Sequence, residues 1–266
     1  MSQENSTSQF QGKTAIISGG AEGIGLSIAK ALGEQQMNVV LADIDRDNLE
    51  RARLELQSLG VSVLAVSLDV ADEGQWQSAA GAAIERFGKI HMVVNNAGVI
   101  AVAPLIETEA DQWVRLLDIN VVGVAMGSKV GAKQMISQGV GGCIVNASSG
   151  GGRHGVANVS QYCASKAAII MLSQSLSQEV AQHKIRVNCY TPGHIMTPLW
   201  EDIIAGMGDK LGRTRDETLQ AFAETIPWGR FGTPEDVAGT VSWLCTPDAE
   251  YISGQCIAMN GAELPW

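Results

Sequence analysis

The sequence predicts a single α/β domain built on a doubly wound parallel sheet, and three observations lead to this fold class. Apolar runs alternate with amphipathic helical stretches along most of the 266 residues, which is a βαβ pattern. Runs such as Ile90–Val94 are continuously apolar, as is typical of strands covered on both faces. Glycine-rich and polar segments follow several of these runs directly, at the strand ends where such sheets bind ligands.

The elements follow one another without a linker rich in Pro, Gly or Ser, so we expect one catalytic domain over residues 11–266 after a polar tail of residues 1–10. A stretch at about residues 197–228 interrupts the alternation. We interpret it as a helical lid over the site, with a solvated surface excursion as the equal alternative. Strands are expected near residues 13–18, 38–43, 61–66, 90–95, 142–147, 184–190 and 255–259, with helices between most of them.

The first expected strand runs into a glycine-rich turn that contains Gly19, Gly23 and Gly25, and a helical pattern begins at Ile24. Glycines allow backbone N–H groups to approach a pyrophosphate at the positive end of a helix. Strand, turn and helix in this order predict a dinucleotide site, whereas the turn alone would be weak evidence.

The second expected strand ends in Asp43, eighteen residues after Gly25. A carboxylate at this place can bind both hydroxyls of an adenosine ribose and repels a 2′-phosphate. The alternative is an ordinary solvated residue at a strand end. The position relative to the glycines favours the cofactor interpretation, and NAD over NADP.

Tyr162 and Lys166 lie one helical turn apart, so the lysine ammonium is expected on the same helix face as the phenol. The positive charge favours the tyrosinate, which could then act as a base near neutral pH. A serine pair, Ser148 and Ser149, ends the apolar run upstream. Taken alone, Tyr162 and Lys166 would be an ordinary surface pair.

Composition excludes several function classes. The net charge of −10 and the pI near 4.8 argue against nucleic acid and anionic membranes as partners. We expect a cytoplasmic protein, because residues 1–9 lack a secretory signal and no apolar run is long enough to span a bilayer. The four histidines lack metal-ligand spacing, so no metal site is expected. The scattered cysteines suit reduced, buried thiols, at Cys143, Cys163, Cys189, Cys245 and Cys256.

With these residues in hand, the chain resembles the short-chain dehydrogenase/reductase superfamily from about residue 11 to its C-terminus. Residues 18–25 resemble the cofactor turn of that superfamily, residues 95–98 its Asn-Asn-Ala-Gly motif, and residues 192–197 the segment that holds the nicotinamide carboxamide. A departure at residues 259–262, Met-Asn-Gly-Ala in place of Val-Asp-Gly-Gly, is expected to change local packing only.

The resemblance implies a Rossmann fold, NAD as cofactor and a catalytic tetrad of Asn120, Ser149, Tyr162 and Lys166. The thirteen-residue gap before Tyr162 selects Ser149 over Ser148. The cofactor contacts that it implies are Gly19, Gly23, Ile24, Gly25, Asp43, Asp69, Val70, Asn96, Ala97, Gly98, Tyr162, Lys166, Pro192, Gly193, Ile195 and Thr197.

Within the superfamily, residues 197–200, the lid and residues 230–237 are most similar to NAD-dependent diol and polyol dehydrogenases. The substrate would be a small secondary alcohol or ketone. A basic cluster of Lys210, Arg213 and Arg215 keeps a phosphorylated polyol open. The candidate substrate contacts are Ile100, Ala101, Gly151, His154, Met196, Leu199 and Trp200.

Two other functions stay open. A 3-oxoacyl thioester reductase would share the tetrad, but such enzymes usually prefer NADPH and carry basic residues where this chain has Asp43. A non-catalytic NAD-sensing protein would not need the whole tetrad. The resemblance also implies a homotetramer, in which the small residues Ala164, Ala167 and Ala168 would let helices of two subunits pack closely. Whether Trp266 reaches a neighbouring subunit is left open.

Overall fold

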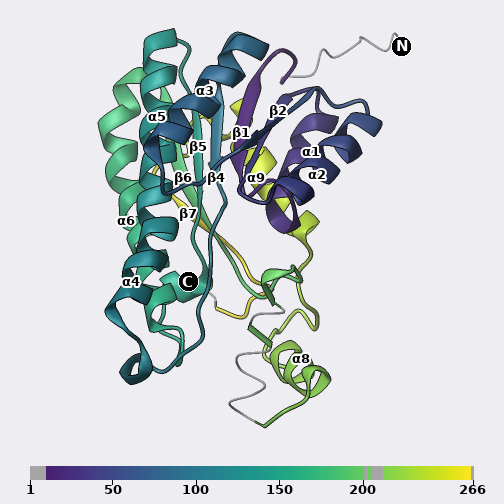
Figure 1. Ribbon diagram of the computed structural model, residues 1–266, viewed down its shortest axis with the longest axis vertical. Coiled ribbons are helices and arrows are strands. Elements are labelled where there is room, and N and C mark those ends of the chain that lie inside the picture. Colours follow the sequence, from purple (N-terminus) through teal and green to yellow (C-terminus); the bar gives the residue numbers. More distant parts are fainter. Residues whose placement is uncertain (1–9, 201–202, 205–211, 265–266) are drawn as a thin grey trace.

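A computed structural model describes residues 10–200, 203–204 and 212–264 of the chain (Figure 1). Its centre is a seven-stranded, all-parallel sheet in the order β3-β2-β1-β4-β5-β6-β7. The strands are β1 (Thr14–Ser18), β2 (Asn38–Asp43), β3 (Val63–Ser67), β4 (Met92–Asn95), β5 (Gly142–Ala147), β6 (Ile185–Pro192) and β7 (Cys256–Met259). The predicted doubly wound parallel sheet is therefore confirmed, and each of the seven predicted strands is present.

Helices cover both faces of the sheet (Figure 1). The α-helices are α1 (Gly23–Glu34), α2 (Arg46–Ser58), α3 (Glu73–Phe87), α4 (Ala110–Leu117), α5 (Gly123–Gln138), α6 (Ser160–Val180), α8 (Arg215–Ala223) and α9 (Pro234–Leu244). Shorter turns are the 3₁₀ helices η1 (Leu105–Glu107), η3 (Gly150–Gly152), η4 (Ala181–His183) and η5 (Pro247–Ala249), and the π-helix η2 (Asp118–Val122).

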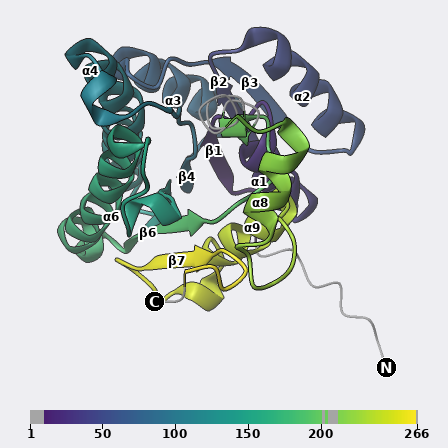
Figure 2. The same ribbon diagram turned by 90° about the horizontal axis from the view of Figure 1, so that it is seen from below.

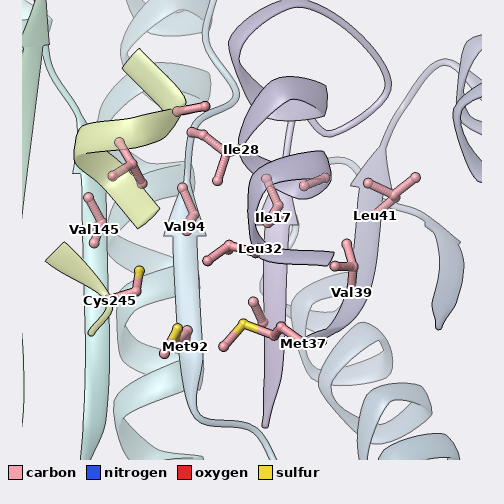
Figure 3. Close-up of a cluster of buried hydrophobic side chains, with 14 of the residues drawn as sticks. Ile17, Ile28, Leu32, Met37, Val39, Leu41, Met92, Val94, Val145 and Cys245 are labelled. Atoms are coloured by element: carbon pink, nitrogen blue, oxygen red, sulfur yellow. The ribbon is translucent and has the colours of Figure 1, made fainter. Parts of the chain in front are cut away.

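The two faces of the sheet carry two cores because side chains alternate along each strand. Ile17 and Leu41 point to the face covered by α1, α2 and α9, where Ile28 and Leu32 pack on them (Figure 3). Ile16 and its neighbours point to the opposite face, against α3, α5 and α6. Both cores are fully buried, which fixes the strand register and the edge at which the strands end.

The chain reverses its winding between β1 and β4, which are neighbours in the sheet. Loops that leave such a switch point run in opposite directions, and a crevice opens beyond the carboxyl ends of the strands. Figure 2 views the molecule from the end where α8 lies.

Some predictions fall on residues outside the described ranges: nearly all of the polar tail, residues 201–202 and 205–211 of the lid stretch, Lys210 and Trp266. Within the described ranges the lid stretch includes α8, and its role as a lid stays a prediction. No helix of the described part is long and apolar enough to cross a membrane.

Candidate active site

A cleft of about 460 Å³ opens at the carboxyl ends of the strands around the switch point. Its lining comes from loops that follow β1, β2, β3, β4 and β6, segments that are far apart in sequence. Many predicted cofactor residues line it: Gly19, Gly23, Ile24, Asp43, Asp69, Val70, Asn96, Ala97, Gly98 and Thr197; Leu199 is the predicted substrate residue that does so.

In the turn after β1, neighbouring atoms leave no room for a side chain at Gly19 or at Gly25. Gly19 has φ 62°, and a Cβ there would lie 2.9 Å from the Ala97 Cα. A Cβ on Gly25 would overlap the Gly19 carbonyl oxygen. The turn leads into the N-terminus of α1, so the cradle fits the pyrophosphate of a dinucleotide.

A polar network holds this turn against β4. The Ser18 hydroxyl accepts hydrogen bonds from the Asn96 N–H (3.1 Å) and the Ala97 N–H (3.2 Å). The Asn96 side-chain amide donates to the carbonyls of Ser18 and Gly19 at 3.2 and 3.1 Å. The buried Tyr190 hydroxyl donates to Asn96 Oδ1 at 2.8 Å. Sequence reasoning missed Tyr190, whose only signal is a phenol inside an apolar strand.

Carboxylates gather where the adenosine ribose of a dinucleotide would lie. Asp43 accepts hydrogen bonds from the Ala21 N–H and the Asp45 N–H, both at 3.1 Å. Glu22 also lines the cleft, and its pKa is raised by partial burial and then by the carboxylates of Asp43 and Asp45. No lysine or arginine is among the described residues that line the cleft. This end of the cleft fits a ribose with free hydroxyls better than one with a phosphate.

Sequence reasoning also missed Glu22. The signal was present, since this residue lies inside the glycine turn and the turn must pass beside the end of β2.

The serine, the tyrosine and a glycine meet at the β5 end of the site. Ser149 lies close enough to Tyr162 to lower its pKa. A Cβ on Gly151 would lie 3.7 Å from Ser149 Oγ and 3.8 Å from Tyr162 Cδ1. Ser148, in contrast, is buried and donates its hydroxyl to the Lys166 carbonyl at 2.7 Å. Ser149 is therefore the serine that faces Tyr162.

Lys166 is 4% exposed, and its side chain extends from α6 towards the loop after β4. Its Nζ donates to the Ala147 carbonyl at 3.0 Å and lies 5.6 Å from the centre of the Tyr162 ring. A Cβ on Gly98 would be 3.2 Å from both Lys166 Nζ and Asn120 Oδ1. Gly98 lines the cleft, so the lysine and the asparagine meet at its wall.

Burial dominates the ionisation of both groups on α6. It raises the pKa of Tyr162 above its usual value, although the nearby Ser149 side chain acts in the opposite direction. It lowers the pKa of Lys166 to about 8. The expectation that the Lys166 ammonium and a cofactor cation together lower the tyrosine pKa concerns the cofactor-bound site and stays a prediction, whereas burial is the largest influence on Tyr162 in the structure described.

Asn120 lies in the π-helix η2, a local widening of the helix between α4 and α5. Its side-chain amide donates to the Val99 carbonyl at 2.9 Å and to Ser165 Oγ at 3.1 Å, and its Oδ1 accepts from the Val99 N–H at 2.9 Å. The side chain thus fastens the loop after β4 to α6.

A second polar network lies beneath the site. Asn95 donates to Ser128 Oγ at 3.0 Å and to Asn146 Oδ1 at 2.8 Å, and Asn146 donates to Ser173 Oγ at 3.0 Å. All four side chains are buried. These hydrogen bonds join β4, β5, α5 and α6, and so fix the position of α6, the helix that carries Tyr162, relative to the sheet.

Other predicted site residues lie beside the cleft or away from it. Pro192 and Gly193 end β6 against Met259, while Ile195 is buried and pairs with Gly232. Among the predicted substrate contacts, Ile100 and Ala101 are half-buried after β4, and His154 and Met196 are exposed.

Trp200 is 6% exposed and packs in an aromatic cluster with His194, Phe222 and Phe231, at ring-centre distances of 4.9 to 5.9 Å. Phe222 belongs to α8, so the cluster ties that helix to the end of β6. Burial lowers the pKa of His194 to about 4. Its Nδ1 lies 3.4 Å from the Glu263 carboxylate, and burial raises the pKa of Glu263.

Within the described residues, no cluster of three or more His, Cys, Asp or Glu side chains could hold a metal ion.

Comparison with known proteins assigns the family. Residues 19–261 match the family described as enoyl-(acyl carrier protein) reductase. Sorbitol dehydrogenase of Cereibacter sphaeroides and galactitol 2-dehydrogenase of Agrobacterium fabrum are each 37% identical over 96% of this chain and 98% of their own. A 3-oxoacyl-[acyl-carrier-protein] reductase of Thermotoga maritima is 32% identical over 95% of this chain and 98% of its own.

A solved structure of a short-chain type dehydrogenase/reductase from Mycobacterium marinum superposes with a TM-score of 0.88, at 30% identity over 96% of both chains. The chain therefore belongs to the short-chain dehydrogenase/reductase family, whose members are oxidoreductases that act on CH–OH groups with a nicotinamide cofactor.

Proposed function

We propose that the protein is an NAD-dependent dehydrogenase that interconverts a small diol or polyol and the matching ketone. The observation that carries this proposal is the cleft itself, which is lined by the carboxylates of Glu22 and Asp43 and by Gly98, the glycine that lies beside Lys166 and Asn120. The similarity to two polyol dehydrogenases supports the substrate class.

The residues of the cleft fit NAD. Gly19, Gly23 and Ile24 would receive the pyrophosphate, Asp43 the adenosine ribose, and Asp69 and Val70 the adenine. The residues proposed to hold the nicotinamide half are Asn96, Ala97, Gly98, Thr197 and the end of β6 at Pro192, Gly193 and Ile195. When bound, the oxidised nicotinamide supplies a hydride acceptor and a positive charge.

Tyr162 acts as the base that removes the hydroxyl proton of the alcohol. Ser149 donates a hydrogen bond to the same oxygen and holds the carbinol carbon in place. Because burial raises the pKa of Tyr162, the free enzyme holds the phenol in its protonated form. Proton removal then depends on added positive charge in the cleft.

Lys166 serves this proton transfer in two ways. Its pKa of about 8 leaves Lys166 mostly protonated at physiological pH but able to release its proton there, so it can pass a proton on as well as stabilise the tyrosinate. Asn120 holds the loop after β4 beside Lys166, and we propose that it also positions a water between the lysine and solvent.

The substrate would lie over Tyr162, between the loop after β4 at Ile100 and Ala101, the loop after β5 at Gly151 and His154, and the lid stretch at Met196, Leu199 and Trp200. The buried Trp200 would shape this space through the aromatic cluster. Secondary alcohols that are small and partly apolar match this mixture of glycine, methyl and ring surfaces.

The test is the initial rate of NADH formation or consumption by absorbance. NAD and NADP are compared against free diols, free and phosphorylated polyols, and a 3-oxoacyl thioester in the reducing direction. Selective NAD turnover of a diol or polyol supports the proposal. NADPH-driven reduction of the thioester would replace it with the acyl reductase, a class to which one relative belongs. Binding of NADH without any turnover would favour a sensor.

We also propose a cytoplasmic homotetramer. The five cysteines are free thiols in the structure, which suits a reducing compartment. Ala164 and Ala167 are exposed on α6, and Met171 on the same helix is 57% exposed. A second α6 could pack closely on this face. Light scattering after size exclusion would report the mass, and a monomer at micromolar concentration would contradict the assembly.

A further inference from the structure

Two cysteines lie side by side at the edge of the sheet. Cys189 on β6 and Cys256 on β7 are direct partners in the strand register, so their side chains leave the same face of the sheet. The two thiols are close enough for each to shift the pKa of the other. Neighbouring strands run about 4.8 Å apart, inside the Cα separation of roughly 4.4 to 6.8 Å that disulfides span.

The two thiols differ in access. Cys189 is 1% exposed and packs against Ile169 and Ile170 of α6. Cys256 is only partly buried, and β7 is the last strand in the order of the sheet. An oxidant in solvent therefore reaches the Cys256 thiol first, because the Cys189 thiol is buried.

The surroundings also favour the thiolate at Cys256. The neighbouring Cys189 thiol, followed by the guanidinium of Arg153, lowers the pKa of Cys256 to about 6. Arg153 Nη2 also donates to the Cys256 carbonyl at 2.5 Å. A partly exposed thiolate beside a buried thiol is the arrangement of an attacking and a resolving cysteine.

A second cysteine pair provides an internal comparison. Cys143 and Cys245 also lie close enough for each thiol to shift the pKa of the other, but they are 1% and 3% exposed. Proximity without access should leave this pair reduced.

We propose that Cys189 and Cys256 form a reversible intramolecular disulfide when the protein meets a hydroperoxide. The Cys256 thiolate attacks a peroxide oxygen, the O–O bond breaks, and hydroxide leaves to give a sulfenic acid. The Cys189 sulfur then attacks the Cys256 sulfur, the S–O bond breaks and water leaves. Two thiols are oxidised to one disulfide, and one hydrogen peroxide is reduced to two waters.

The disulfide would close a loop that contains residues 190–255. This loop includes the aromatic cluster, α8 and α9. A cross-link over so long a segment restricts the unfolded chain, so the oxidised protein should be harder to unfold. For a chain of this size we expect the Tm to rise by about 5 °C, and to return when the bond is reduced.

The test treats the native, full-length protein with hydrogen peroxide, blocks free thiols with an alkylating agent, and maps peptides by mass spectrometry. We expect a linked peptide pair that contains Cys189 and Cys256, Cys143 and Cys245 alkylated as free thiols, and a Tm rise that dithiothreitol reverses. A failure to find the linked pair in the wild type, or equal oxidation of the Cys143–Cys245 pair, would overturn the proposal without any variant.

Variants sharpen the assignment. Cys256→Ala should abolish the peroxide-dependent Tm rise, whereas Cys143→Ala should keep it. In Cys189→Ala the resolving thiol is missing, so a sulfenic acid should accumulate at Cys256 and be trapped by dimedone. Labelling of Cys163 in place of Cys256 would contradict the proposal. Since every readout is covalent or thermal, the result is independent of the substrate.

Discussion

Two sides of the site differ in the residues that enclose them. The proposed cofactor side lies around β1 to β4, and the proposed substrate side lies around β5 to β7 and α8. On the cofactor side the walls are backbone, glycine and short polar side chains that bond one another, as Ser18 and Asn96 do. On the proposed substrate side, large rings such as Trp200 and Phe222, drawn from segments far apart in the chain, pack against one another. The proposed cofactor side is thus held by short polar contacts, and the proposed substrate side by ring packing between distant segments.

Tyr162 lies on the boundary and gives the largest expected effect. Tyr162→Phe removes only the phenolic oxygen, so the substrate side should lose turnover by about a hundredfold to ten-thousandfold. Cofactor affinity, followed by NADH fluorescence, should stay within about twofold, because the cofactor walls are untouched. Equal loss of turnover and NADH binding would show that the two sides are not separable at this residue.

Gly25→Ala, in contrast to Tyr162→Phe, changes the proposed cofactor side. The added methyl group overlaps the Gly19 carbonyl, and overpacking of this kind costs about 1 to 3 kcal/mol. We expect the Kd for NADH to rise about tenfold or more in a titration. The matched control is Gly81→Ala on α3, where nothing lies within 4 Å of the new Cβ. That variant should bind normally and unfold at a slightly higher temperature.

Asp43→Ser tests whether charge selects the cofactor. Loss of the carboxylate should raise the ratio of NADP to NAD activity by about tenfold, since hydrogen bonds to a charged group contribute roughly 1.5 to 3 kcal/mol. Asp47→Ser is the control, because Asp47 lies on α2 outside the cleft lining. If the ratio of NADP to NAD activity stays constant in Asp43→Ser but changes in Glu22→Gln, the charge that selects the cofactor lies in the glycine turn.

The substrate side should show its own, smaller dependence on pH. The pKa of His194 is about 4 when folded and about 6.5 when unfolded. Between these values the unfolded chain binds a proton that the folded chain does not, so the free energy of unfolding falls as the pH falls from 6.5 to 4.

The raised pKa of Glu263 acts in the opposite direction, so we expect the net loss to be smaller than the one that His194 alone would cause. Urea titrations across this range, compared with His194→Phe, would measure it. A variant that keeps the full wild-type slope would show that another group titrates.

Sequence patterns predicted residues that meet in one cleft on the proposed cofactor side, because the spacing there is local. The turn from Gly19 to Gly25 and the acid Asp43 lie within one βαβ unit, where the spacing of residues determines the distances in space. The bounds of the predicted strands agree with the structure to within two residues.

The substrate side was less predictable because long-range packing decides it. Trp200 could be expected near the lid, but no spacing rule brings it to Phe231. The π-helix η2 at Asn120 has no sequence signature. The pKa of Tyr162 depends on burial, which only the folded chain defines. Tyr190 and Glu22 were missed because their partners, Asn96 and Asp43, come from other segments of the sequence.

The buried network of Asn95, Ser128, Asn146 and Ser173 has a consequence for how this enzyme can evolve. Replacing any one of these side chains leaves a hydrogen-bonding partner stranded away from water, which costs about 1 to 3 kcal/mol. Gly127 is part of the same arrangement, because a side chain there would collide with the side-chain amide oxygen Oδ1 of Asn95. These positions should show strong epistasis, so a recombinant that exchanges α6 with a relative must exchange its network partners with it.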